Sequence, residues 1–299
     1  MPSYLHNKLL WSWYQMAVRH RGGIETNYSP LPFLSSPVVL MRNIMKHRNL
    51  LGVFVFKDLR KKYRGSIAGY GWTMIEPLVM TAVFYVLFGI ITSGKDEFRP
   101  LHIIIGILTW YYFQRTVVGF TNMFQSRKSL IQVVYFPREV FLCSILLFNA
   151  IVLVLSLIVV LPLVYYYGLI PNWRIIFLPY CILMVGLLSS GIGLFSSILQ
   201  TRVKDTEHVV NLAMRVGFYL SPCFYTLETM SRVPEPYINS YLFANPMAVY
   251  LTMIRSAFTG SPTGISDSHI ISSFGVTLVV FFLGTIFFLR NERQAVKYI

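Results

Sequence analysis

Long apolar stretches, separated by shorter polar ones, are the dominant pattern along the chain. Each has the length of roughly 20 residues that an α-helix needs to cross a bilayer. The predicted spans cover residues 74–92, 102–122, 140–167, 175–199, 209–226 and 270–289. The pattern therefore predicts an all-α membrane protein with six transmembrane helices, and the even number places both termini on one side.

The basic residues between these stretches indicate which side that is. Residues 1–73 alone carry eleven Lys and Arg residues, and the loops at 123–139 and 200–208 carry further ones, as does the C-terminal tail. All the segments on the opposite side together carry five. Because Lys and Arg collect on the cytoplasmic side of membrane proteins, we expect both termini to be cytoplasmic.

One outer segment, residues 227–268, is too long for a tight turn and too apolar for a solvated loop. Asn245 and Pro246 split its apolar part into halves of about ten residues, each too short to span a membrane. Proline ends a helix at the residue before it. We therefore predict a re-entrant pair of short helices, which must be buried in protein or line a cavity. The alternative is an ordinary outer loop with one interfacial helix.

On the inner side, the pattern before the first span is that of a basic amphipathic helix lying in the plane of the membrane interface. Its apolar face is formed by Leu51, Phe54, Val55 and Leu59. The chain then divides into three parts: a cytoplasmic N-terminal extension at 1–49, an interface helix at 50–72 and a transmembrane domain at 73–299.

Composition agrees with a membrane protein and narrows its partners. Hydrophobic residues make up 55% of the chain and charged residues 13%, whereas soluble domains carry about 25% charge. The net charge of +14 is explained by topology, so we expect no nucleic-acid partner. Cys143, Cys181 and Cys223 fall in or beside apolar runs without C-x-x-C spacing, so we expect neither a metal site nor a disulfide framework.

Residues 89–96, GIITSGKD, match the opening of a phosphate-binding P-loop. A working P-loop requires Ser or Thr after its Lys to hold Mg²⁺, and a helix to follow. Here Asp96 follows Lys95, and the segment lies in a short loop on the outer side. We interpret it as a turn between two spans, and we do not expect this segment to bind ATP.

Nothing else in the chain suggests catalysis. It contains four Asp and eight Glu residues, no carboxylate pair within the apolar stretches, and no nucleophile motif. The six His residues are scattered without metal-ligand spacing. We therefore expect no catalytic residue, no metal ligand and no cofactor in this chain.

Three other features suggest binding. The run Arg60, Lys61, Lys62 and Arg64 lies at the inner surface and can attract an anionic lipid head or a diphosphate; anchoring of the helix is the alternative. Aromatic residues make up 16% of the chain, and they can stack on sugar rings or form the interfacial belt. Arg115 and Arg215 lie inside apolar stretches, where a charge requires a cavity or a partner; snorkelling to the inner face is the alternative for Arg215.

Four motifs, in this order, resemble permease subunits of ABC-type polysaccharide exporters. They are RKKYRGSIAGYGWTMIEPLVMTAVFYVLFG at 60–89, LIQVVYFPREVF at 130–141, TRVKDTEHVVNLAMRVGFYLSPCFY at 201–225 and NPMAVYLTMIRSAF at 245–258. The resemblance covers about residues 50–290. It implies the type-2 ABC exporter permease fold, with a re-entrant pair before the last span, in the bacterial cytoplasmic membrane.

The resemblance also implies partners and residue roles. It implies a homodimer with two copies of a cytoplasmic ABC ATPase, which binds the ATP and Mg, and a substrate on undecaprenyl diphosphate or another lipid. The basic residues Arg60, Lys61, Lys62 and Arg64 would receive the lipid headgroup. ATPase coupling would involve Arg127, Lys128, Phe136, Pro137, Arg138 and Glu139. The re-entrant turn would be Asn245 and Pro246. Channel aromatics would be Tyr63, Trp72, Tyr85, Trp110 and Tyr219.

Two functions therefore compete. The first is the channel-forming subunit of an exporter of a lipid-linked glycopolymer, such as O-antigen, a capsule-like polysaccharide or teichoic acid. The second is a membrane enzyme that acts on polyprenyl-linked sugars, which the missing carboxylate pair disfavours. A small-molecule or drug exporter of related fold is a third alternative.

Overall fold

The computed structural model describes residues 36–63, 65, 69–91, 98–133, 138–169, 173–227, 230, 233–295 and 297. This part of the chain is helical and contains no strand. Its α-helices are α2 (Ser36–Lys46), α3 (Arg48–Tyr63), α4 (Trp72–Ile91), α5 (Arg99–Thr121), α6 (Met123–Ser126), α7 (Lys128–Val133), α8 (Arg138–Leu157), α9 (Val160–Tyr166), α10 (Leu178–Arg202), α11 (Thr206–Leu220), α12 (Glu235–Ala244), α13 (Pro246–Thr259) and α14 (Asp267–Ala295). Short 3₁₀ turns precede α4 and α10 at Gly69–Gly71 and Trp173–Phe177.

Five of the described helical segments are long and apolar enough to cross a membrane. They are Trp72–Ile90, Arg99–Thr121, Arg138–Tyr166, Trp173–Arg202 and Asp267–Glu292. They coincide with five of the six predicted spans. At the remaining one, 209–226, only α11 is helical, and its 15 residues extend about 22 Å, short of the roughly 30 Å of a bilayer core. The chain turns extended at Ser221, where ψ is 151°.

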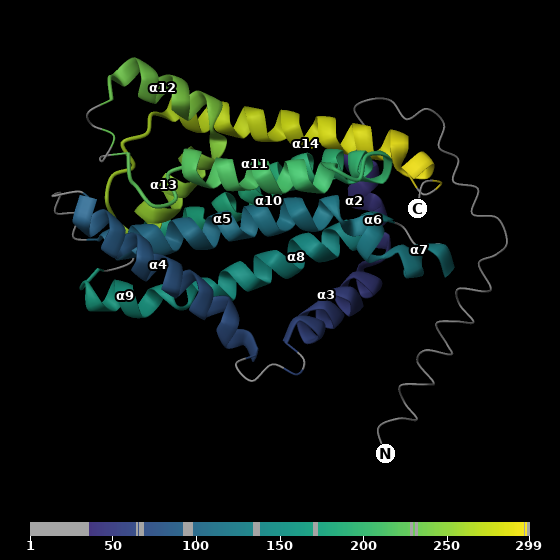
Figure 1. Cartoon of the computed structure of the whole chain (residues 1–299). Coiled ribbons are helices and arrows are strands. Elements are labelled where there is room, and N and C mark those ends of the chain that lie inside the picture. Colours follow the sequence, from purple (N-terminus) through teal and green to yellow (C-terminus); the bar gives the residue numbers. More distant parts are fainter. Residues whose placement is uncertain are drawn as a thin grey trace.

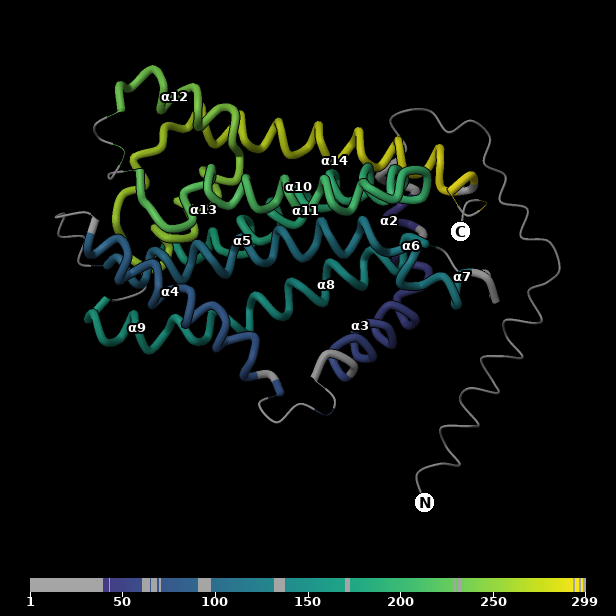
Figure 2. Tube along the Cα trace, viewed as in Figure 1, coloured from purple at the N-terminus to yellow at the C-terminus, as the bar shows by residue number. Residues whose placement is uncertain are grey.

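The long helices lie side by side in one bundle (Figure 1). Figure 2 shows α12 and α13 at one end of this bundle and α6 and α7 at the opposite end. The segments that the sequence assigns to the outer and inner sides are therefore separated by the length of the long helices.

Helix α10 packs against both α5 and α14 in the centre of the bundle. Its contact with α14 is made by backbone: a Cβ added to Gly284 would lie 2.1 Å from the carbonyl oxygen of Gly191. Gly193 is packed as tightly, since a Cβ there would meet the Phe120 side chain at 2.6 Å. Small residues at these positions let helices approach closely, which is how membrane helices gain packing energy.

A helix covers part of the predicted interface helix at 50–72, and its place in the membrane interface stays a prediction. Helix α3 covers Arg48–Tyr63 and ends well before residue 72. Phe54 and Val55 are buried, and the Phe54 ring lies 4.9 Å from that of Phe141 on α8. The apolar face of α3 is thus used for packing against the bundle, while Val53 and Phe56 on its other side are exposed.

Candidate functional site

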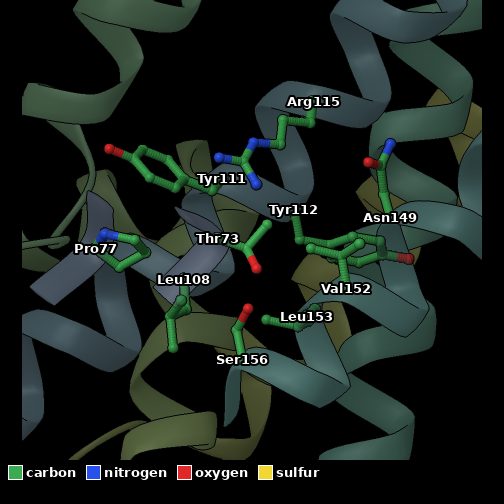
Figure 3. Close-up of a pocket in the computed structure, with 10 residues that line it drawn as sticks. All are labelled: Thr73, Pro77, Leu108, Tyr111, Tyr112, Arg115, Asn149, Val152, Leu153 and Ser156. Carbon is green, nitrogen blue, oxygen red and sulfur yellow. The ribbon is translucent and has the colours of Figure 1, made fainter. Parts of the chain in front are cut away.

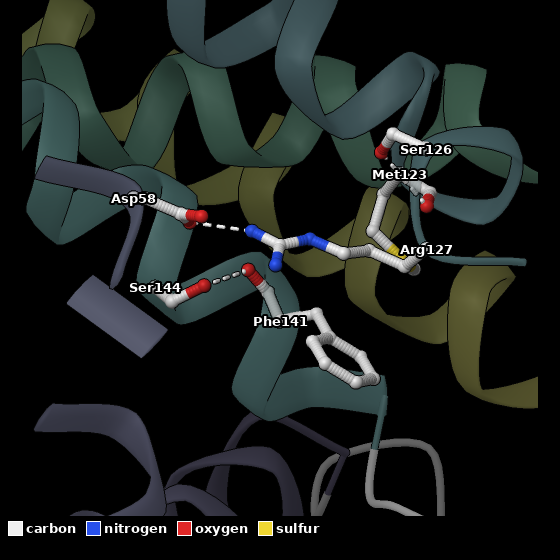
Figure 4. A network of polar contacts seen from close by, with 6 residues as sticks. All are labelled: Asp58, Met123, Ser126, Arg127, Phe141 and Ser144. Atoms are coloured by element: carbon white, nitrogen blue, oxygen red, sulfur yellow. Dashed lines mark hydrogen bonds and ion pairs between the residues drawn. The ribbon is translucent and has the colours of Figure 1, made fainter. Parts of the chain in front are cut away.

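The connection between α5 and α8 is tied to the rest of the bundle by two arginines. Arg127, between α6 and α7, forms an ion pair with Asp58 on α3 (Figure 4), and its guanidinium lies 5.7 Å from the ring of Phe54. Arg138, at the start of α8, lies 3.6 Å from Glu292 near the end of α14. A displacement of this connection would therefore act directly on α3 and on α14.

Several of the residues predicted to contact an ATPase are paired or buried within this subunit. Arg127 and Arg138 are occupied by acidic side chains of the same subunit, and Glu139 is buried. Lys128 is exposed on α7. Phe136 and Pro137 lie outside the described residues, so their predicted role is untested.

Of the predicted headgroup residues, the structure describes the side chain of one. Arg60 is exposed on α3. Lys61 and Lys62 belong to the same helix, but their side chains, like Arg64, lie outside the described part.

The predicted channel aromatics fall into two groups. Trp72, Tyr85 and Tyr219 are exposed, with Trp72 showing 59% of its surface. The side chain of Tyr63 is outside the described part. Trp110 is only 3% exposed within the subunit, and its place on a substrate path stays a prediction.

Trp110 is buried because it fills the contact between α5 and α11. A Cβ on Gly217 would lie 2.9 Å from its ring, and the Phe218 ring is 6.1 Å away. Phe84 from α4 and Phe224, which follows α11, lie beside them. These two rings stack on each other with their centres 5.2 Å apart. The mid-span aromatic residues therefore hold three helices together.

One of the two arginines that the sequence places inside apolar stretches, Arg115 on α5, has a specific partner. Its Nη2 lies 3.0 Å from Oε2 of Glu76 on α4. Its guanidinium carbon lies 4.9 Å from the centre of the Tyr111 ring. The sequence pointed to Arg115 but not to Glu76, because the two residues are 39 positions apart. Arg215 on α11, by contrast, is exposed.

A recess lies beside this pair, between α4, α5 and α8 (Figure 3). It is narrow, with a volume of about 10 Å³, which is about the space that one water molecule needs. Its lining residues are Thr73, Pro77, Leu108, Tyr111, Tyr112, Arg115, Asn149, Val152, Leu153 and Ser156. Six of these ten side chains are polar, which is unusual for a wall made of membrane-spanning helices.

At the opposite end, the prediction of two short helices divided at Asn245 and Pro246 is confirmed. The Asn245 side chain caps α13 by accepting a hydrogen bond of 3.3 Å from the backbone N–H of Ala248. It also donates to the Ser221 hydroxyl at 3.1 Å. Helix α13 is buried along almost its whole length, as a re-entrant segment requires.

Tyrosine hydroxyls join the end of α11 to this helical pair. Tyr225 and Tyr241 both donate to the carbonyl oxygen of Leu220, each at 2.9 Å. Burial raises the pKa of the Tyr241 hydroxyl, so it remains a neutral donor. The carbonyl at the end of α11 is thereby satisfied within the protein.

Arg255 on α13 is a residue that the sequence did not single out. It is 4% exposed, and it donates to the backbone carbonyls of His102, Tyr225 and Cys223 at 3.0, 2.8 and 2.9 Å. Gly106 makes room for this contact, since a Cβ there would lie 2.0 Å from the Cys223 oxygen. The sequence could have indicated Arg255, because a cation within a short apolar helix must be buried with hydrogen-bonding partners.

Comparison with known proteins identifies relatives over most of the chain. The family model described as "ABC-2 type transporter" matches residues 49–259. An "O-antigen export system permease protein RfbA" from Myxococcus xanthus is 27% identical over 219 residues, which cover 73% of this chain and 84% of the relative. Two proteins of the same name from Klebsiella pneumoniae are 23% and 25% identical, covering 78% and 70% of this chain and 88% and 80% of the relatives.

Proposed function

The chain belongs to the ABC-2 type transporter family, and on that basis we propose that it exports a lipid-linked glycopolymer as the channel-forming subunit of an ATP-driven complex. It is a membrane transport subunit of the permease type, so the prediction of transport rather than sugar-transferring catalysis is confirmed. The observation that carries the glycopolymer assignment is the similarity to three O-antigen export permeases over at least 80% of their lengths. O-antigen, a capsule-like polysaccharide and teichoic acid all belong to this proposed substrate class of lipid-linked glycopolymers.

We propose that the functional unit is a homodimer that meets along α4 and α11. Both helices leave apolar side chains exposed, among them Val79 and Val83 on α4 and Leu212 on α11. Each also carries an exposed charge in this apolar surface, Glu76 and Arg215. Lipid tails cannot solvate such charges, whereas a second copy and a polar path between the copies can. In that assembly, α11 and the residues after it complete the sixth crossing, with both termini cytoplasmic.

We propose further that the connection between α5 and α8 meets the partner ATPase, two copies of which bind ATP and Mg. It lies at the end of the bundle opposite the buried α13 (Figure 2). The Arg127–Asp58 ion pair then transmits ATPase movement to α3, whose exposed Arg60 lies in the basic run proposed to receive the lipid diphosphate.

The transport assignment is tested by purifying the chain with its ATPase and placing the complex in lipid vesicles. We expect undecaprenyl diphosphate that carries a sugar chain to stimulate ATP hydrolysis and to cross the membrane. Stimulation by small amphiphilic drugs, with no response to the glycolipid, would instead assign the complex to small-molecule export.

The coupling step is tested by charge reversal. Asp58→Arg and Arg127→Asp should each reduce the glycolipid exported per ATP hydrolysed, because each leaves a like-charge contact, and the double variant should restore it. Lys57→Asp, at an exposed neighbouring position, serves as the control. Full coupling in both single variants would show that this pair transmits nothing.

A further inference from the structure

The ion pair between α4 and α5 faces outward from the subunit. The side chains of Arg115 and Glu76 are 30% and 54% exposed. Glu76 lies on a helical stripe with Trp72, Val79 and Val83, which are all exposed as well. A stripe that contains a carboxylate is not a lipid-facing surface, because hydrocarbon does not solvate that group.

The pair lies within the inner half of the membrane-spanning region. Glu76 is four residues from the start of α4, and Arg115 is six residues from the end of α5. With a rise of 1.5 Å per residue, they lie about 6 Å and about 9 Å from those helix ends. A molecule that enters from the inner surface would meet this pair early in its passage.

The chemistry around the pair is that of hydrogen-bonding groups with no net charge. Arg115 can donate and Glu76 accepts, and the Tyr111 ring lies beside the Arg115 guanidinium. Deeper in the recess, Thr73 and Ser156 point their hydroxyls toward each other across the gap (Figure 3). Such a wall offers both donors and acceptors to an incoming molecule.

Because this wall carries one positive and one negative group, it favours a neutral sugar over a phosphate. A phosphate would be repelled by Glu76 at nearly the distance at which Arg115 attracts it. A sugar ring presents hydroxyls that donate to a carboxylate and accept from a guanidinium, so it gains from both members of the pair. Trp72, one helical turn before Glu76 and largely exposed, adds an apolar face of the kind that packs on a sugar ring.

We propose that Glu76 and Arg115, with Tyr111 and Trp72, form a binding station for uncharged sugar rings on the wall of the translocation path. The proposal rests on the function proposed above and specifies which part of the substrate this wall recognises. The lipid diphosphate binds elsewhere, at the basic run on the inner surface.

The test separates hydrogen bonding from charge. The first variant, Glu76→Gln/Arg115→Gln, keeps hydrogen-bonding amides in place of the charges, and the second, Glu76→Met/Arg115→Met, removes hydrogen bonding at similar volume. Val279→Met, at an exposed position of α14 away from this stripe, is the control. Each variant, in complex with the partner ATPase in lipid nanodiscs, is titrated with two probes: undecaprenyl diphosphate carrying a short chain of neutral hexoses, and undecaprenyl diphosphate alone.

We expect the double Met variant to raise the half-maximal concentration of the sugar-bearing probe for stimulating ATP hydrolysis by about tenfold, from the loss of two hydrogen bonds. The double Gln variant should change it by less than about threefold. Neither variant should alter the response to the sugar-free probe.

Three results would overturn the proposal. An equal loss for both probes would assign the pair to the carrier phosphate. Dissociation of the double Met complex into single permease subunits would assign it to the subunit interface. An unchanged response to the sugar-bearing probe would leave the pair no role in binding.

A different result would contradict the proposed glycopolymer function itself: a wild-type complex that responds to neither probe. None of the three results above contradicts that function.

Discussion

Two arginines in apolar helices differ in how the protein satisfies them. Arg255, in the region around α13 that the proposed orientation places on the outer side, is almost fully buried, and three backbone carbonyls surround it. Arg115, in the region between α4 and α5 that the same orientation places nearer the inner side, is partly exposed and paired with one carboxylate. A saturated, inaccessible cation fixes the structure, whereas a partly exposed pair has donors and acceptors left for another molecule. The residue type alone does not distinguish these roles.

The helices that carry the two residues show the same contrast. The most apolar stretch of α5 is 72% buried, whereas that of α4 is 17% buried. Helix α13 is too short to span, yet it is buried along most of its length. Burial within one subunit therefore separates the helices that build its core from those that leave an exposed surface, where we propose the partner copy and the substrate path.

The largest expected effect comes from removing the outer cation. Arg255→Met should lower the free energy of unfolding by about 3 kcal/mol or more, because three buried carbonyls lose a charged donor. Thermal unfolding of the purified protein in detergent measures this loss. A melting temperature close to that of the wild type would show that the carbonyls find other partners.

A second prediction tests the space that the outer contact needs. Gly106→Ala should destabilise by about 1–3 kcal/mol, because the added Cβ would lie 2.0 Å from the Cys223 oxygen and 2.7 Å from Arg255 Nη2. Gly275→Ala is the control, since nothing lies within 4 Å of a Cβ there. Equal melting temperatures for the two variants would contradict the close approach.

A smaller effect is expected at the cap of α13. Asn245→Ala removes the acceptor for the Ala248 N–H and the donor to Ser221, and it should cost about 1 kcal/mol. Asn245→Asp keeps the acceptor and should recover much of that loss. If both variants unfold like the wild type, the cap does not contribute to stability.

The smallest change in stability is expected at the inner pair. Arg115→Met should alter the free energy of unfolding by about 0–1 kcal/mol, because partly exposed ion pairs contribute little. Unfolding is measured as for Arg255→Met, so the same substitution is compared in two environments. A loss as large as that at Arg255 would mean that Arg115 is also structural, and the contrast between the two regions would disappear.

Sequence periodicity predicted the helices well because each apolar stretch reflects the local length of a membrane span or a buried helix. It also predicted the division at Asn245 and Pro246, since proline and a capping side chain act locally. It did not show that α11 ends at Leu220, because the apolar stretch continues past the helix end.

Contacts between side chains far apart in the sequence could not be predicted in this way. Glu76 and Arg115 are separated by 39 positions and Asp58 and Arg127 by 69, so no periodic pattern relates them. The burial of Trp110 was not predicted for a similar reason: it depends on the absence of a side chain at Gly217 on another helix. Contacts between distant segments are a property of the packing of the whole bundle.

The glycine contact between α10 and α14 also has a consequence for motion. With the Gly191 and Gly284 backbones in direct contact, neither helix can slide or roll past the other without a steric clash. We therefore expect these two helices to move as one rigid body during transport. Distance probes placed across α10 and α14 should report the same value with and without ATP.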